Sequence, residues 1–153
     1  MRLACLALCL AFMLVAPVRL ALAESEAPII NVDSSGYAIG RYDPVAYFTL
    51  GRPVRGKTHL TARYKGANYA FSSPANRALF NANPEKYAPQ YGGYCAYGVV
   101  HGSKSAIDPQ LWEIVGGRLY FLINAGTLSI WTRKKNSYIQ TANKAWKLIS
   151  KPK

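Results

Sequence analysis

The sequence lacks the short motifs of the common enzyme classes. It has no Gly-x-Ser-x-Gly nucleophile motif, and neither of its glycine pairs is followed by the lysine and hydroxyl of a phosphate-binding loop. Cysteine is scarce, with three residues and no Cys-x-x-Cys pair. Acidic residues are scarce too, at 7 against 19 lysines and arginines, and no two acids can be argued to share a site. Whether this protein is an enzyme stays open, and a non-enzymatic role is favoured.

The first 23 residues have the pattern of a cleavable secretory signal peptide. Arg2 supplies a positive start, residues 3–15 are uninterrupted apolar residues, and Ala21-Leu22-Ala23 offers the small residues that signal peptidase accepts. The apolar run is shorter than the roughly 20 residues that span a membrane. Because Arg19 is unusual at its position, a retained membrane anchor is the alternative. We predict export to the periplasm or beyond, with cleavage near Ala23.

Cleavage would leave one small basic domain with a single cysteine. Cys5 and Cys9 fall within the signal peptide, so Cys95 remains alone and a disulfide scaffold is excluded. The remaining length suffices for a core without disulfides. Residues 24–35 are polar and predict a flexible leader, and residues 36–150 predict the folded domain.

The turn and cap signals predict a small α+β domain with two β-hairpins, a central short helix and C-terminal helices. Each hairpin is a pair of short apolar runs around a glycine turn. Ser73 and Pro74 mark the start of the central helix, which Asn83-Pro84 ends. No internal repeat is visible. The predicted runs are residues 60–64 with 68–71 and residues 111–115 with 119–123, and the C-terminal helices are predicted from Asn124 to about residue 135 and over about residues 136–149.

Three blocks of sequence resemble the exported branch of the YHS-domain family, whose members are labelled YHS-domain (seleno)proteins. They are Gly40-Arg41-Tyr42-Asp43-Pro44-Val45-Ala46-Tyr47-Phe48, Tyr69-Ala70-Phe71-Ser72-Ser73, and the run from Asn83-Pro84-Glu85-Lys86-Tyr87 to Tyr94-Cys95-Ala96-Tyr97. The similarity continues through Trp112, Trp131 and Trp146, so it covers about residues 36–148.

The resemblance also shows which residues are missing. YHS modules of heavy-metal pumps typically carry three cysteines, one shortly after Asp-Pro-Val and two in a Phe-Cys-Ser-x-x-Cys pattern. Such soft thiolates suit copper(I) or zinc. Here the three positions hold Ala46, Ser72 and Asn76. The resemblance therefore implies a YHS scaffold without its original metal site. Independently of the resemblance, Asp43 before Pro44 is typical of a turn-forming residue, which is favoured over a general base.

Cys95 has three open interpretations: a buried structural cysteine, a redox thiol, or a metal ligand. A metal ligand would need partners, and His101 lies six positions further along a loop that contains glycine. Copper or zinc would suit a mixed sulfur and imidazole site, with His59, Asp43 or Asp108 as further ligands.

Two further features bear on ligands and partners. Tyr91, Tyr94 and Tyr97 lie in a glycine-containing segment and either line a binding pocket or fill the core. Residues 133–153 contain seven basic residues and no acid. Outside the cytoplasm this favours an anionic membrane surface over nucleic acid, and a solvated helix face is the alternative. We predict a periplasmic binding or accessory protein for a metal ion or small ligand, with a thiol redox protein or a purely structural protein as alternatives.

Overall fold

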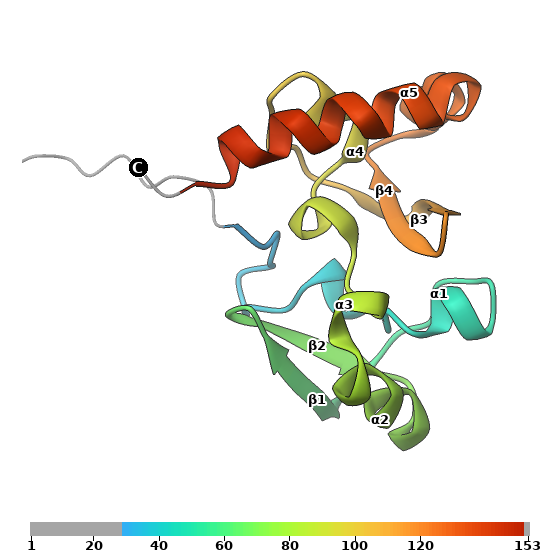
Figure 1. Ribbon diagram of the computed structural model, residues 1–153. Helices are drawn as coiled ribbons and strands as arrows, with labels where there is room; N and C mark the ends of the chain where they lie inside the picture. The colour runs from blue at the N-terminus through green and yellow to red at the C-terminus, as the bar shows by residue number, and fades with distance from the viewer. Residues whose placement is uncertain (1–28, 152–153) are drawn as a thin grey trace, which may run out of the picture.

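The computed structural model describes residues 29–151, so the predicted signal peptide lies outside the described residues. Helix α5 runs across one end of the molecule beside β3 and β4, and the β1–β2 hairpin with α2 occupies the other end (Figure 1). Within residues 29–151 no helix is long and apolar enough to cross a membrane. In chain order the elements are η1 Ile39–Arg41, α1 Ala46–Thr49, β1 Lys57–Tyr64, β2 Ala67–Phe71, α2 Pro74–Ala82, α3 Pro84–Tyr87, η2 Gln90–Gly93, α4 Ala96–Val100, β3 Asp108–Val115, β4 Arg118–Leu122 and α5 Ala125–Ile149.

The predicted α+β class and both antiparallel hairpins are confirmed. The predicted helix starts are also confirmed. The hydroxyl of Ser73 accepts from the backbone N–H of Asn76 at 3.1 Å, and the side chain of Asn124 accepts from Thr127 at 2.8 Å. The two predicted C-terminal helices form one helix, α5, which is kinked at Lys134 with φ −140°.

The two hairpins are built alike. Each pairs an eight-residue strand with a five-residue strand across a two-residue turn, and each has a register shift near the start of its longer strand. Corresponding residues lie 51 positions apart in the sequence. The pairs on either side of the shift are Lys57 with Phe71 and Thr61 with Ala70 in the first hairpin, and Asp108 with Leu122 and Trp112 with Phe121 in the second.

The same offset continues into the helices that follow. Asn83, with φ −152°, separates α2 from α3, and Lys134, 51 positions later, is the kink in α5. Helices α2 and α3 together therefore correspond to the first part of α5, as far as Tyr138. The chain contains a structural repeat that the sequence analysis did not detect. We call residues 39–88 the first repeat and residues 90–149 the second repeat.

The two hydrophobic clusters each contain an aromatic pair at equivalent positions, and the first cluster also takes in Leu119 and Phe121 of the second repeat. In the first, the rings of Tyr69 and Phe80 lie 4.9 Å apart between centroids. In the second, Tyr120 and Trp131 lie 5.6 Å apart. Pairs of this kind contribute about 0.5–1.5 kcal/mol beyond the burial of their surface. Both repeats therefore pack one helix against one hairpin in the same way.

The sequence predicts a flexible leader over residues 24–35. For residues 29–35 this prediction is wrong, because they belong to the folded unit. Ile30 is only 9% exposed and packs in the first cluster. The backbone N–H of Asn31 donates to the carbonyl of Gly92 at 2.8 Å, and its side chain donates to Gly93 at 3.1 Å. The prediction failed because polar residues that pair with a neighbouring backbone look like an unstructured segment in sequence.

A left-handed turn over Ile39–Arg41 leads into Asp43. All three residues of the turn have positive φ, at 56°, 54° and 68°. This conformation is unfavourable for residues other than glycine, by about 1–2 kcal/mol each, and rare for a β-branched side chain such as Ile39. The surrounding contacts must therefore hold the turn in place.

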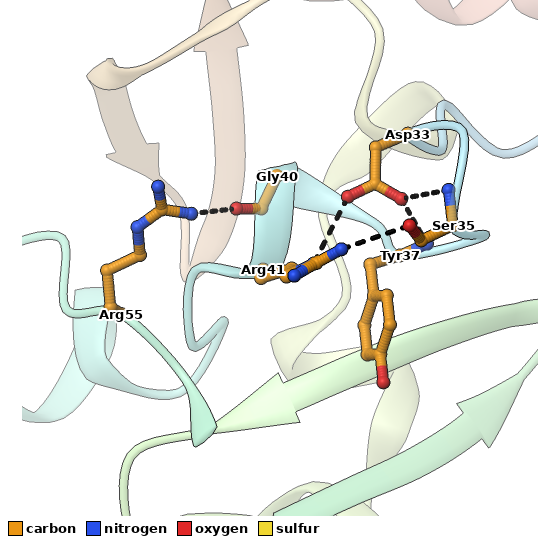
Figure 2. A network of polar contacts seen from close by, with 6 residues as sticks. All are labelled: Asp33, Ser35, Tyr37, Gly40, Arg41 and Arg55. Atoms are coloured by element: carbon orange, nitrogen blue, oxygen red, sulfur yellow. Dashed lines mark hydrogen bonds and ion pairs between the residues drawn. The ribbon is translucent and has the colours of Figure 1, made fainter. Parts of the chain in front are cut away.

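Two arginines hold this turn (Figure 2). Arg41 donates to the hydroxyl of Ser35 at 3.0 Å and lies 3.5 Å from the carboxylate of Asp33. Arg55 donates to the carbonyl of Gly40 at 2.8 Å. The ring of Tyr37 lies beneath the Arg41 guanidinium, 5.1 Å from its centroid. The turn is thus fixed from both sides, which sets the position of the Asp43 backbone.

Candidate functional site

Asp43 is the most enclosed polar residue of the first repeat, with an exposed fraction of 0%. One carboxylate oxygen accepts from the backbone N–H groups of Val45 at 2.9 Å and Ala46 at 3.3 Å. The other accepts from the backbone N–H of Ser72 at 2.8 Å, the hydroxyl of Ser72 at 2.7 Å and the amide of Asn76 at 2.7 Å. The carboxylate is therefore satisfied entirely by protein donors.

The three positions that carry thiols in the pump modules all converge on this carboxylate. Ala46 contributes its backbone N–H, and Ser72 and Asn76 contribute their side chains. None of them offers a soft ligand, and the donors that surround Asp43 oppose a cation there. Within residues 29–151 no group of three or more His, Cys, Asp or Glu side chains could hold a metal ion. The residues present do not fit a copper or zinc ion at this position.

A groove of about 860 Å³ lies between the two repeats. Ten of its lining residues are five pairs of equivalent positions, so the groove follows the boundary between the repeats. Ile29, Ile30 and the residues just before and within η2 close one side. The equivalent pairs are Tyr64 and Val115, Lys65 and Gly116, Tyr69 and Tyr120, Glu85 and Asn136, and Ala88 and Ile139.

Tyr91 forms part of the groove wall in a strained conformation, with φ 54°. Its hydroxyl donates to the side-chain oxygen of Asn143 at 2.9 Å. Its ring lies 5.8 Å from that of Tyr120 and 6.0 Å from that of Trp146. Gly92 follows with positive φ, and a β-carbon there would overlap the carbonyl oxygen of Ile29. Close backbone packing therefore forces Tyr91 into this position.

The comparison with known families decides what the first repeat is. Residues 45–91 match the family model of the YHS domain. This chain carries a YHS domain. The matched segment begins two residues after Asp43, contains all three positions that lack thiols and ends at Tyr91. Neither a search of the curated proteins nor a search of the solved structures found a match.

Outside the YHS domain, Cys95 lies 52 positions after Asp43, one more than the offset between the repeats, and its backbone makes a similar contact. The backbone N–H of Asp43 donates to Val54 at 2.8 Å, and that of Cys95 donates to Ser105, 51 positions after Val54, at 3.1 Å. Cys95 is 1% exposed. His101 is exposed at the end of α4. The metal and redox roles of Cys95 stay predictions.

The burial of Cys95 predicts an inert thiol in the folded protein. Maleimide should leave Cys95 unmodified under native conditions and modify it fully in guanidinium chloride, as read by mass spectrometry. As a control, Ser137→Cys adds a thiol on the exposed face of α5, which should react rapidly. Native labelling of Cys95 as fast as that of the control would favour the redox interpretation.

The three tyrosines predicted as ligand-binding candidates lie near the end of the YHS domain, but each has different surroundings. Tyr91 lines the groove. Tyr94 is buried in the second cluster, with its ring 6.3 Å from Trp146. Tyr97 packs against Tyr138 at 5.3 Å and does not line the groove. The structure therefore brings one of the three to the candidate site.

Sequence reasoning missed the other four aromatic residues of the groove, which are Tyr64, Trp146 and the pair Tyr69 and Tyr120. Tyr69 and Tyr120 are identical residues at equivalent positions of the repeats. Their spacing in the sequence was the signal that could have pointed to the groove. Burial raises the pKa of Tyr91 well above its usual range; the neighbouring Tyr120 adds to the rise and Arg118 opposes it. The phenol of Tyr91 is therefore a neutral hydrogen-bond donor near pH 7.

Proposed function

We propose that this protein is an exported binding protein that holds a small organic ligand in the groove between its two repeats. The volume of the groove falls within the range of about 300–1,000 Å³ usual for small-molecule sites. The observation that carries the proposal is Tyr91, which is held at the groove wall in a strained conformation with its hydroxyl paired. Export rests on the pattern of the first 23 residues.

The other candidate centres support binding less well. The Asp43 carboxylate has no access to solvent and is surrounded by its own donors. The thiol of Cys95 is enclosed in the second cluster. Of these three candidate centres within residues 29–151, the groove is the one that combines aromatic walls with polar groups at a site open to solvent, which is the usual composition of a ligand site.

Blocking the groove should abolish binding of a neutral aromatic probe. The chain from residue 24 should bind N-phenylnaphthylamine with a saturable rise in the fluorescence of the probe. Asn136 is exposed on α5 and lines the groove, so Asn136→Trp places an indole in the ligand space. We expect this substitution to weaken binding about tenfold or more, a loss of about 1.4 kcal/mol.

Ser137→Trp is the matched control, because Ser137 is the next residue of α5, is exposed and does not line the groove. It should bind the probe as the parent does. Equal affinities for the two tryptophan variants, both with the parent's circular dichroism spectrum, would contradict the proposal.

The basic residues near the C-terminus lie on the exposed surface of α5 and just beyond it. Arg133, Lys134, Lys144 and Lys151 are exposed, whereas Lys135 pairs with Glu113. Leu148 is 73% exposed on the same helix. Contact with an anionic membrane surface stays a proposal that rests on this charge and on the exposed leucine.

A further inference from the structure

We infer that the groove selects organic anions: its ligand has an apolar, ring-sized body and one anionic head group, which Arg118 binds. This inference rests on the proposed function and specifies its ligand class. It follows from the charges, the free hydrogen-bond donors and the apolar surface of the groove.

The charges of the groove differ between the two repeats. On the side of the first repeat, the ammonium of Lys65 lies 3.9 Å from the carboxylate of Glu85, which leaves that wall close to neutral. The equivalent positions in the second repeat are uncharged. That side instead carries Arg118 and Lys147, and neither forms an ion pair with an acidic residue of the described chain. The groove therefore has an excess of positive charge on one side.

Arg118 is placed to bind an anion. One of its terminal nitrogens donates to the neutral side-chain oxygen of Gln90 at 3.1 Å, which holds the guanidinium without compensating its charge. Its positive charge opposes the burial that raises the pKa of both Tyr91 and Tyr120, which line the same groove. A guanidinium has five N–H donors in a planar arrangement that suits a carboxylate, sulfonate or phosphate.

Three tyrosine hydroxyls at the groove also lack protein partners. Tyr64, Tyr69 and Tyr120 line the groove, and their hydroxyls make no hydrogen bond to any residue between 29 and 151. The hydroxyl of Tyr64 is moreover buried from solvent. Buried polar groups in native proteins normally have partners. Because burial raises the pKa of Tyr69 and Tyr120, these phenols stay protonated donors, which suits a ligand rich in acceptors.

One part of the groove is apolar. Trp146 presents its ring beside Tyr91, and Ile139 and Ala88 occupy equivalent positions on the two repeats. Such a surface is suited to an aromatic or alicyclic body. A small inorganic anion would leave this apolar surface unused, so the structure favours an amphipathic organic anion.

Two fluorescent probes with the same ring system separate charge from shape. Anilinonaphthalene sulfonate carries one sulfonate, and N-phenylnaphthylamine is its neutral counterpart. We expect the chain from residue 24 to bind the sulfonate more tightly. Arg118→Gln should weaken binding of the sulfonate about tenfold and leave binding of the neutral probe within about twofold. The preference for the sulfonate should also fall as salt rises.

Arg63→Gln is the matched control, because Arg63 is an exposed arginine of β1 that does not line the groove. It should bind both probes as the parent does. If both probes bind equally and Arg118→Gln changes neither, the inference is overturned while the proposed function stands. Equal losses of sulfonate binding in the two arginine variants would show a general effect of charge and would also overturn it. Failure of both probes to bind the parent would remove the proposed function itself.

Discussion

Asp43→Ala should destabilise the protein by about 4 kcal/mol, the largest loss that we expect from any single substitution outside the apolar core. The methyl group would remove the acceptor of five hydrogen bonds in a buried region. The backbone N–H groups of Val45 and Ser72 and the hydroxyl of Ser72 would then have no acceptor, and an unsatisfied buried donor costs more than the net value of the hydrogen bond it loses. Denaturant unfolding followed by circular dichroism at neutral pH measures the loss.

Asp43→Asn tests the chemical reason for this loss. The amide has nearly the same shape as the carboxylate, but one of its two ends donates instead of accepting. Because both ends of Asp43 face donors, an asparagine must place its own N–H groups against an N–H of the backbone or of Asn76. We therefore expect a loss of more than half of that caused by alanine.

Asp33→Ala is the control for the same local motif in a more exposed place. Asp33 accepts from the backbone N–H groups of Ser35 at 2.9 Å and Tyr37 at 3.0 Å, and it lies near Arg41. Its side chain is partly open to water, so the donors that it leaves can be solvated. We expect a loss of about 1 kcal/mol. A loss at Asp43 no larger than that at Asp33 would show that the buried network is not a major source of stability.

Local signals explain which parts of the fold could be predicted. Glycine at the two hairpin turns, Ser73 before Pro74, and Asn124 at the start of α5 each act through a few neighbouring backbone groups. The same holds for Asp43, whose carboxylate accepts from Val45 in the predicted turn. Interactions that lie within three residues of each other in sequence leave a pattern that can be recognised there.

The groove could not be predicted because it depends on how the two repeats meet. Its walls come from positions 51 residues apart, and most of these pairs share no side-chain chemistry, as Glu85 and Asn136 show. Strand register and cap positions, which set the backbone, are kept between the repeats, while the side chains differ. The tyrosine-rich segment was a partial guide, because glycine packing against Ile29 directs only Tyr91 to the groove.

Restoring the three thiols should restore a metal site to the YHS domain. Ala46→Cys, Ser72→Cys and Asn76→Cys combined would add three thiols beside Asp43, which the backbone N–H of Ala46 and the side chains of Ser72 and Asn76 contact. We expect the triple variant to bind zinc with a free energy on the order of 10 kcal/mol, a Kd of roughly tens of nanomolar, and the parent to show no site there. Cobalt(II) reports the site through thiolate charge-transfer absorbance, which zinc should remove.

The single variant Ser72→Cys is the control, since one added thiol cannot form such a site and should leave cobalt absorbance at the level of the parent. If the triple variant folds but shows no charge-transfer absorbance, its three sulfurs do not lie close enough together to bind one metal ion, and the prediction is wrong. Binding by the triple variant would mean that the backbone of the metal site persists, and that substitution of its ligands converted it into the hydrogen-bonded centre of the first repeat. In that case binding would have moved from the interior of one repeat to the groove between two, where Arg118 and the unpaired tyrosine hydroxyls lie.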